Sequence, residues 1–278
     1  MADAAAPEIT GNVLFYNTPE PLNSEKHAKL GLKNIGKPFG FAKTGHIVPV
    51  TLGEFGLAAM SYPIIFAGPE FTPLAVMGLK AGQNLFVQED GGFEEGFYLP
   101  AYIRRYPFVL AGNDEQTEMI VCIDVSSPLI GENTNTPLFD DKGATTEYTK
   151  NAIKFCEDFE GERVRTTQWI EMLRGLDIFE MKQAAFTPMS ANGDTGQPIL
   201  IAEYQAISEE KVNALPDEKL LELQKNGALG FIYAHLLSLL AWDRLIALAA
   251  KRGPDALPQG APAAANASGA SRPTCVIL

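Results

Sequence analysis

Short apolar or alternating runs, separated by glycine and proline, fill the first half of the chain. Between residues 13 and 130 such a run recurs about every ten residues, which is the spacing of strands joined by tight turns. The runs that predict strands are 13–16, 46–50, 63–66, 74–79, 84–87, 106–110 and 118–124. So many short strands in succession favour a mainly antiparallel arrangement, either a twisted sheet or an open barrel.

One short helix interrupts the predicted strands. Thr51 and Glu54 have the spacing of a capping box, in which each side chain accepts a hydrogen bond from the backbone of the other residue. The apolar residues 55–60 follow directly, so we expect this helix to pack on the sheet. Pro63 then ends it, because proline lacks the backbone N–H that a further turn needs.

The second half of the chain has the periodicity of helices rather than strands. Between 145 and 174 apolar residues recur three or four positions apart, which predicts one long helix with a buried stripe that ends near Gly175. Two further apolar runs, 181–187 and 198–207, flank an Asn-Gly pair at 192–193 and predict a late hairpin.

More helices are predicted after this hairpin. Ser208 has the position of an N-cap, and Pro216 stands in the first turn of the next helix. The last helix covers 228–251 and ends in Lys-Arg-Gly, residue types that suit a helix C-terminus. Its apolar stretch is interrupted by His235 and is shorter than the roughly 20 residues that cross a bilayer, which predicts a core helix.

Together these patterns predict a single α+β domain. It has a mainly antiparallel β N-terminal half with one early helix, and long helices with a late hairpin in the C-terminal half. Residues 1–12 are expected to form a flexible tail, and residues 13–252 the folded domain. Residues 253–278 are rich in proline and alanine, a composition that is typical of a disordered tail.

Charge and cysteine content exclude several classes of function. The 278 residues include 22 Lys+Arg against 34 Asp+Glu, a formal net charge of −12. Nucleic acids and anionic membranes are recognised through basic surfaces, so neither is an expected partner. Three cysteines without paired spacing indicate neither a disulfide framework nor a structural zinc site. The N-terminus has neither the basic nor the apolar segment of a secretory signal peptide.

No motif in the sequence indicates a catalytic centre or a cofactor. The chain has no phosphate-binding glycine loop and no nucleophile elbow, and its three histidines lack the neighbouring carboxylate of an iron-binding motif. Asp124, Asp140 and Asp141 are interpreted as turn and strand-end residues, and His235 as a hydrogen-bonded core residue. We therefore expect no metal or cofactor, and favour a protein without enzymatic activity.

A few polar residues are candidates for binding a ligand. Arginine beside aromatic rings can clamp a carboxylate or stack on a ring, and the segment 102–106 offers this combination. The favoured alternative is that each arginine has a buried stem and pairs with one of the many acids. His27 follows a polar loop, and Glu54 lies among apolar residues. The candidate ligand-binding residues are His27, Glu54, Tyr102, Arg104, Arg105 and Tyr106.

The last four residues, Cys275–Leu278, match the CaaX pattern for prenylation. The segment before them has one arginine and no polybasic stretch, and so loose a pattern often arises by chance. We therefore do not expect lipidation at Cys275.

An ordered series of short motifs runs through residues 13–250 and leaves the proline- and alanine-rich tail outside. The motifs are Pro21–Asn23 with His27, Val48–Val50 with Glu54–Phe55, Tyr62–Phe66, Asn84–Val87, Pro100–Phe108, Cys122–Asp124 with Ser127–Pro128, Pro137–Phe139, and Gly227–Leu229 with Tyr233–Leu239. In this series the chain resembles the bacterial SapC family, which is named for a surface-layer-associated protein. The resemblance assigns no catalytic residue, so none is carried over to this chain.

The resemblance implies a surface-layer or envelope-associated interaction protein without catalytic activity. The protein is expected in the cytoplasm unless an uncleaved signal in the C-terminal tail exports it to the cell surface. The family's gene neighbours encode TonB-dependent receptors, flavin-dependent halogenases and cupin-like proteins. They imply an alternative role as a cytoplasmic partner or enzyme in the modification or uptake of a peptide or aromatic substrate. A homodimer through the long helices is a third alternative.

Overall fold

The computed structural model describes residues 13–112, 119–187, 196–258 and 275–277. Helices and antiparallel sheets combine in an α+β fold, as the sequence predicts, and no sheet closes into a barrel within these residues. The expected flexible segment 1–12, the expected turn at 192–193 and most of the predicted tail lie outside the described residues.

The largest sheet has six strands, and each neighbouring pair is antiparallel. Its strands are β3 (Ile47–Pro49), β4 (Ile64–Ala67), β5 (Thr72–Val76), β10 (Phe179–Phe186), β11 (Ile199–Ile207) and β12 (Cys275–Ile277). Their order is β12-β10-β11-β4-β5-β3, so the late hairpin pairs with strands from the early part of the chain. The pair Gln205–Phe66 makes this connection between β11 and β4.

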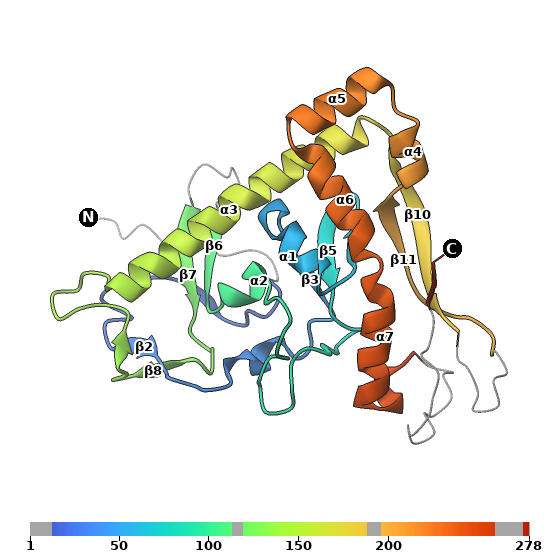
Figure 1. Ribbon diagram of the computed structural model, residues 1–278. Coiled ribbons are helices and arrows are strands. Elements are labelled where there is room, and N and C mark those ends of the chain that lie inside the picture. The colour runs from blue at the N-terminus through green and yellow to red at the C-terminus, as the bar shows by residue number, and fades with distance from the viewer. Residues whose placement is uncertain (1–12, 113–118, 188–195, 259–274, 278) are drawn as a thin grey trace.

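Two smaller sheets of three strands each lie to one side of it (Figure 1). One contains β1 (Pro19–Pro21), β6 (Phe108–Gly112) and β7 (Met119–Asp124), with β7 in the centre. The other contains β2 (Leu30–Leu32), β8 (Ile130–Glu132) and β9 (Thr136–Pro137), with β2 in the centre. Every pair in both sheets is antiparallel, and both sheets join the first residues of the fold to segments much later in the chain.

Helices fill the second half of the chain, as predicted. The described α-helices are α1 (Phe55–Ala59), α2 (Ala101–Arg104), α3 (Glu147–Arg174), α4 (Glu209–Asn213), α5 (Asp217–Lys225), α6 (Ala228–Ser238) and α7 (Ala241–Arg252). Short 3-10 helices are η1 (Pro38–Ala42), η2 (Leu52–Glu54) and η3 (Pro254–Ala256). Figure 1 shows α3 running from the small sheets up to α5, with α6 and α7 following each other beside the large sheet.

The long helix α3 belongs to two hydrophobic cores. Thr146 caps its start by accepting the backbone N–H of Thr149, and Gly175 stands at its end. Near its start, Cys156 packs into a cluster with strands of the two small sheets. Further along, Phe159 and Trp169 pack into the main core between the large sheet and the helices. The predicted buried stripe is therefore confirmed at Phe159, Trp169 and Leu173, whereas Tyr148 near the start of the helix is 42% exposed.

The same helix supports the turn that precedes α1. The Thr166 hydroxyl accepts the backbone N–H of Leu52 at 3.0 Å, and the Glu162 carboxylate accepts that of Gly53 at 3.1 Å. These N–H groups open η2 and have no partner within it, so α3 supplies the acceptors that the turn lacks. The predicted capping box of Thr51 and Glu54 is present at the same place.

Two of the predicted strands are wrong. Residues 13–16 form a turn in which Phe15 has a left-handed φ of 77°, whereas a strand needs a negative φ. Residues 84–87 also turn away from strand geometry. The cause is a local hydrogen bond. The Asn84 side chain accepts the backbone N–H of Phe86 at 2.9 Å, so this N–H is not available to pair with a neighbouring strand.

Two details of the predicted helices also differ. The side chain of Ser208 makes no capping hydrogen bond at the start of α4. The single helix predicted over 228–251 is divided into α6 and α7 at Leu239 and Leu240. The backbone N–H groups of both residues bond to carbonyls three positions earlier, which tightens the helix locally and interrupts its regular turn.

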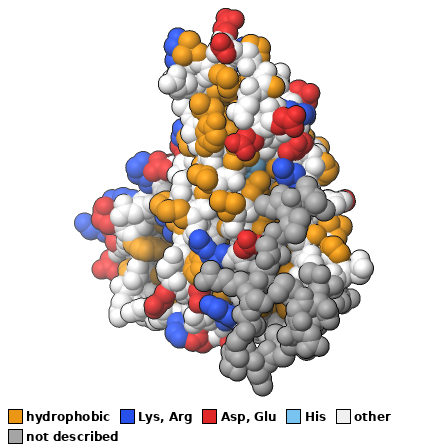
Figure 2. Space-filling view, turned by 45° about the vertical axis from the view of Figure 1, so that its right-hand side comes forward, with side chains coloured by type: hydrophobic (Ala, Val, Ile, Leu, Met, Phe, Trp, Pro, Cys, Tyr) orange, Lys and Arg blue, Asp and Glu red, His pale blue; other side chains and the backbone are white. Residues whose placement is uncertain are grey.

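Taken together, α6 and α7 (Ala228–Arg252) are long and apolar enough, by length and composition alone, to cross a membrane. Core helices pass the same test, and 44% of the most apolar window is buried inside the fold. Its buried side chains include Ile232, His235 and Trp242. Hydrophobic side chains also remain on the outside of the molecule, where Figure 2 shows them as a broken vertical band.

The packed region extends a few residues beyond position 253. Ala256 and Leu257 are buried against the main core, and Lys80 donates to the carbonyl of Asp255 at 2.7 Å. The chain therefore packs through Pro258, and residues 275–277 pair with β10 as strand β12, whereas composition alone assigns everything from residue 253 onward to a disordered tail.

Candidate functional site

The structure distributes the six predicted ligand-binding residues over separate places. Glu54 and Arg104 meet at one tyrosine side chain, and Arg105 stacks on Tyr102. Tyr106 and His27 each contact a further set of residues. Each group has its own geometry.

Glu54 is a buried carboxylate whose two oxygens are occupied by internal hydrogen bonds. Its Oε2 accepts from the backbone N–H and the hydroxyl of Thr51, at 2.9 and 3.0 Å. Its Oε1 accepts from the backbone N–H of Ala101 at 2.6 Å and from the Tyr98 hydroxyl at 3.1 Å. Ala101 is the first residue of α2, so this carboxylate ties η2 to the start of that helix.

Arg104 reaches the same tyrosine from the other side. Its Nη2 donates to the Tyr98 hydroxyl at 3.0 Å, and its Nε donates to the carbonyl of Leu99 at 3.1 Å. The Tyr98 hydroxyl thus accepts from Arg104 and donates to Glu54. Burial and the charge of Glu54 raise the pKa of Tyr98, which keeps this hydroxyl protonated and able to donate.

Arg105 points elsewhere and lies against aromatic rings. Its guanidinium carbon is 4.0 Å from the ring centre of Tyr102, 4.7 Å from that of Phe159 and 5.9 Å from that of Tyr16. Its Nε is buried without a hydrogen-bond partner. No carboxylate of the described residues forms an ion pair with it. Stacking, rather than pairing with an acid, holds this charge in place.

Tyr106 belongs to a cluster around Asp124, a fully buried residue at the end of β7. The Tyr106 hydroxyl donates to Asp124 Oδ2 at 3.2 Å, and its ring stacks on Phe41 with centres 3.9 Å apart. Burial raises the pKa of Tyr106 to about 12. Asp124 also accepts the backbone N–H groups of Asn17 and Thr18, at 3.0 and 3.1 Å, and so holds the chain before β1.

Sequence reasoning identified Asp124 only as a strand-end residue. The local signal is the spacing Asp-x-Ser, because Asp124 Oδ1 accepts from the N–H and the hydroxyl of Ser126 at 3.1 and 2.6 Å. Burial alone would raise the pKa of Asp124, but hydrogen bonds from Ser126 and from the N–H groups of Asn17 and Thr18 lower it below its usual value. No sequence signal marks these last two contacts.

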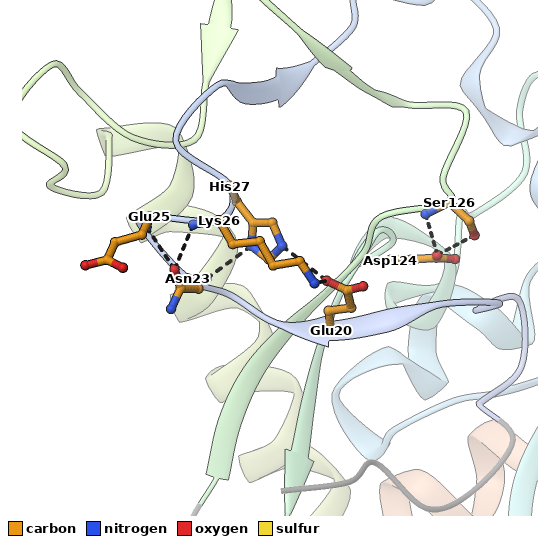
Figure 3. A network of polar contacts seen from close by, with 7 residues as sticks. All are labelled: Glu20, Asn23, Glu25, Lys26, His27, Asp124 and Ser126. Carbon is orange, nitrogen blue, oxygen red and sulfur yellow. Dashed lines mark hydrogen bonds and ion pairs between the residues drawn. The ribbon is translucent and has the colours of Figure 1, made fainter. Parts of the chain in front are cut away.

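His27 is buried, and its two ring nitrogens face the backbone of Asn23 and the carboxylate of Glu20, as Figure 3 shows. Its Nδ1 accepts the backbone N–H of Asn23 at 3.1 Å, so in the neutral ring the proton lies on Nε2. Nε2 then donates to Glu20 Oε2 at 3.4 Å. Lys26 also pairs with Glu20, and these two hydrogen bonds lower the pKa of Glu20. His27 therefore fixes the turn between β1 and β2.

Two open depressions lie near these residues, and neither brings the six together. The first has a volume of about 550 Å³ and is lined by Glu20, Pro21, Asn23, Glu25 and Lys26. The second has a volume of about 530 Å³ and is lined by Tyr106 and Asn17, by the aromatic residues Phe15, Tyr16 and Phe41, and by their neighbours. Of the six candidates, only Tyr106 lines either depression.

The other residues interpreted from sequence are readily placed. His235 is a core residue, as predicted: its Nε2 accepts the N–H of Ile207 at 3.1 Å, and burial lowers its pKa to about 3. Cys122 and Cys156 are buried thiols, and the side chain of Cys275 lies outside the described residues. In the described ranges, no three His, Cys, Asp or Glu side chains are placed to hold a metal ion.

An apolar area lies on the outside of α1 and α6. We define the α1–α6 surface as the side chains of Leu57, Met60, Tyr233, Leu237 and Leu240, which are 42–69% exposed. The two helices pack directly on each other, and Arg244 of α7 donates to the carbonyl of Met60, which places the end of α1 beside α6 and the start of α7. Sequence analysis predicted only a core helix over residues 228–251. The signal for this surface is the second apolar stripe, at 233, 237 and 240.

Comparison with known proteins gives one match. The model of the SapC family matches residues 22–245, which is most of the chain and includes every candidate residue described above. No curated protein and no solved structure matches the chain.

Proposed function

Since the chain belongs to the SapC family, whose model matches residues 22–245, we propose that it is an interaction protein of the bacterial surface layer or cell envelope, without catalytic activity. The family name supports the location. The exposed side chains support the mode of action.

The observation that carries this proposal is the α1–α6 surface. Exposed leucine, methionine and tyrosine side chains on the outside of two neighbouring helices support a role in protein contact. By contrast, Glu54 and Asp124 use their oxygens in hydrogen bonds that hold the fold together. The polar candidates thus support the structure, and the apolar side chains are free for a partner.

Fractionation of the native bacterium tests the proposed location. With an antibody against the chain, we expect the protein in the outer membrane fraction or in a low-pH extract of the cell surface. Leu237→Glu should reduce the amount retained there, because a charge in the apolar surface opposes docking. Leu200→Glu is the matched control, since Leu200 is a similarly exposed leucine on β11. Protein confined to the cytosol would contradict the proposal.

The proposed export route has its own test. Residues 259–278, which include strand β12, are the proposed location of an uncleaved export signal. A chain that ends at Pro258 keeps the buried Leu257 and should accumulate inside the cell. Unchanged export of this shortened chain would exclude the C-terminal route.

A second candidate function is favoured by Arg105. In this alternative the protein is a cytoplasmic partner or enzyme that modifies or takes up a peptide or aromatic substrate. It would act with halogenase-like or cupin-like proteins, or with a TonB-dependent receptor. The specific observation is that the Arg105 guanidinium lies against aromatic rings and that its Nε has no hydrogen-bond partner. No Asp or Glu among the described residues forms an ion pair with it. A ligand with a carboxylate and a ring matches that chemistry.

Calorimetric titration with tryptophan and with a short tryptophan-containing peptide tests this alternative. Arg105→Lys keeps the charge but loses the planar fork, so binding should weaken about tenfold or more. Arg104→Lys is the control, because Arg104 bonds to Tyr98 and Leu99 instead. Failure of both ligands to bind, or equal binding to both variants, would remove Arg105 from consideration.

A further inference from the structure

Exposed apolar residues of α6 and of the junction that follows it recur at a regular spacing. Tyr233 and Leu237 of α6, and Leu240 between α6 and α7, are separated by four and three positions, which is the spacing at which two helices pack side by side. They are 42, 63 and 69% exposed. The opposite side of the helix, with Ile232 and His235, is fully buried on the large sheet. The helix therefore has two apolar sides, and only one of them is covered.

Leu57 and Met60 widen this stripe. Leu57 of α1 and Met60, the residue that follows this helix, are 51 and 62% exposed, and α1 packs against α6. From the exposed fractions, the five side chains of the α1–α6 surface present about 500 Å² of accessible area, near the upper end for a single patch on a monomer. A standard interface buries roughly 800 Å² on each partner, and roughly two-thirds of that area is apolar in homodimers. The surface thus has the apolar area that one half of a homodimer interface needs.

We propose that the α1–α6 surface binds a second copy of this chain, with the two α6 helices packed antiparallel across a two-fold axis. This inference rests on the proposed interaction function and names the partner for that surface. A two-fold interface uses the same patch on both subunits, so one apolar stripe supplies both halves. Leu237 is the middle residue of the stripe and lies nearest the axis.

A membrane surface fits this face less well. Helices that lie on anionic bilayers carry lysine and arginine on their polar side. α6 contains neither residue, and the chain has a net charge of −12. The same net charge repels a second copy, but salt screens that repulsion over about 10 Å at 0.1 M. Association through the apolar surface should therefore strengthen as salt is added.

Light scattering after size exclusion, on the full chain at increasing concentration and at two salt concentrations, tests the proposal. The wild-type protein should reach twice its 30.1 kDa mass, at lower concentration in higher salt. Leu237→Glu should remain a monomer and raise the dissociation constant about a hundredfold or more. Leu200→Glu should behave as wild type, and circular dichroism should show that both variants are folded.

A cross-link checks the antiparallel geometry independently. Leu237→Cys in a Cys275→Ser background should form a disulfide-linked dimer on mild oxidation, because the axis brings the two positions together. Wild-type protein that stays monomeric throughout, or a dimer that persists in Leu237→Glu, overturns the proposal. So does a monomer that floats with phosphatidylglycerol–phosphatidylcholine vesicles and loses this binding in Leu237→Glu. A dimer confined to the cytosol would leave this inference standing while the proposed location fails.

Discussion

Two buried carboxylates, Glu54 and Asp124, each hold together segments that are far apart in the chain. The local half of each arrangement is visible in the sequence, as a capping box for Glu54 and as an Asp-x-Ser turn for Asp124. The distant half is not, because it depends on how the elements pack. No spacing rule links Glu54 to Ala101, or Asp124 to Asn17. The sequence therefore indicates which residues are noteworthy, but not that these carboxylates join distant segments of the fold.

Replacing the Glu54 carboxylate should destabilise the fold. In Glu54→Gln one oxygen becomes an NH₂ group, which cannot accept from the backbone N–H groups and hydroxyls that face it. We expect the free energy of unfolding to fall by about 2–3 kcal/mol, measured by urea denaturation. The exposed Glu95 provides a matched control, and Glu95→Gln should change stability by less than about 0.5 kcal/mol. Equal stability of the two variants would contradict the structural role.

Asp124 should make stability depend on acid pH. Its hydrogen bonds lower its pKa in the folded protein below the usual 3.8, so the folded state favours the charged form. The resulting stabilisation is fully present above the pKa of the unfolded chain and is lost as pH falls through the folded-state pKa. Urea denaturation between pH 5 and pH 2 should therefore show a shallower decline for Asp124→Asn than for wild type. Parallel curves would contradict this linkage.

At the scale of elements, long helices and strands could be predicted from the sequence, whereas strands of two or three residues could not. The long helix α3 and the hairpin of β10 and β11 contain enough periodic residues for the pattern to be clear. The two- and three-residue strands β2, β8 and β9 contain no such pattern, and tertiary pairing alone defines them. The same limit explains why residues 13–16 and 84–87 resemble strands yet form turns.

The contact between α3 and η2 is a testable case of such tertiary support. Thr166→Val leaves the buried backbone N–H of Leu52 without its acceptor, so unfolding free energy should fall by about 1–3 kcal/mol. Thr166→Ser keeps the hydroxyl and should recover most of this loss. Thr167→Val, one residue further on the exposed side of α3, is the control and should have little effect. A Thr166→Val protein as stable as the Thr167→Val protein would show that the contact contributes nothing.

At the scale of the whole molecule, the folded region ends later than composition predicts. Proline and alanine suggest a tail from residue 253, but Ala256 and Leu257 pack on the core. Composition describes the segment as a whole and does not detect a few residues that find a place against the fold.

Two shortened chains should differ in stability for this reason. A chain that ends at Gly253 loses the buried side chain of Leu257, whereas one that ends at Pro258 keeps it. Both lack the later residues, so the comparison isolates 254–258. The shorter chain should be less stable by about 2 kcal/mol, the value of one buried leucine, in thermal or urea unfolding. Identical stability would place the end of the folded region at residue 253.

The helix α3 contributes Cys156 to the core of the small sheets and Phe159 to the main core, one turn apart. Neither core can open there without disturbing the other, because the backbone between these residues is a continuous helix. We therefore expect the two parts of the molecule to unfold together, and amide hydrogens in the middle of α3 to be among the slowest to exchange with solvent.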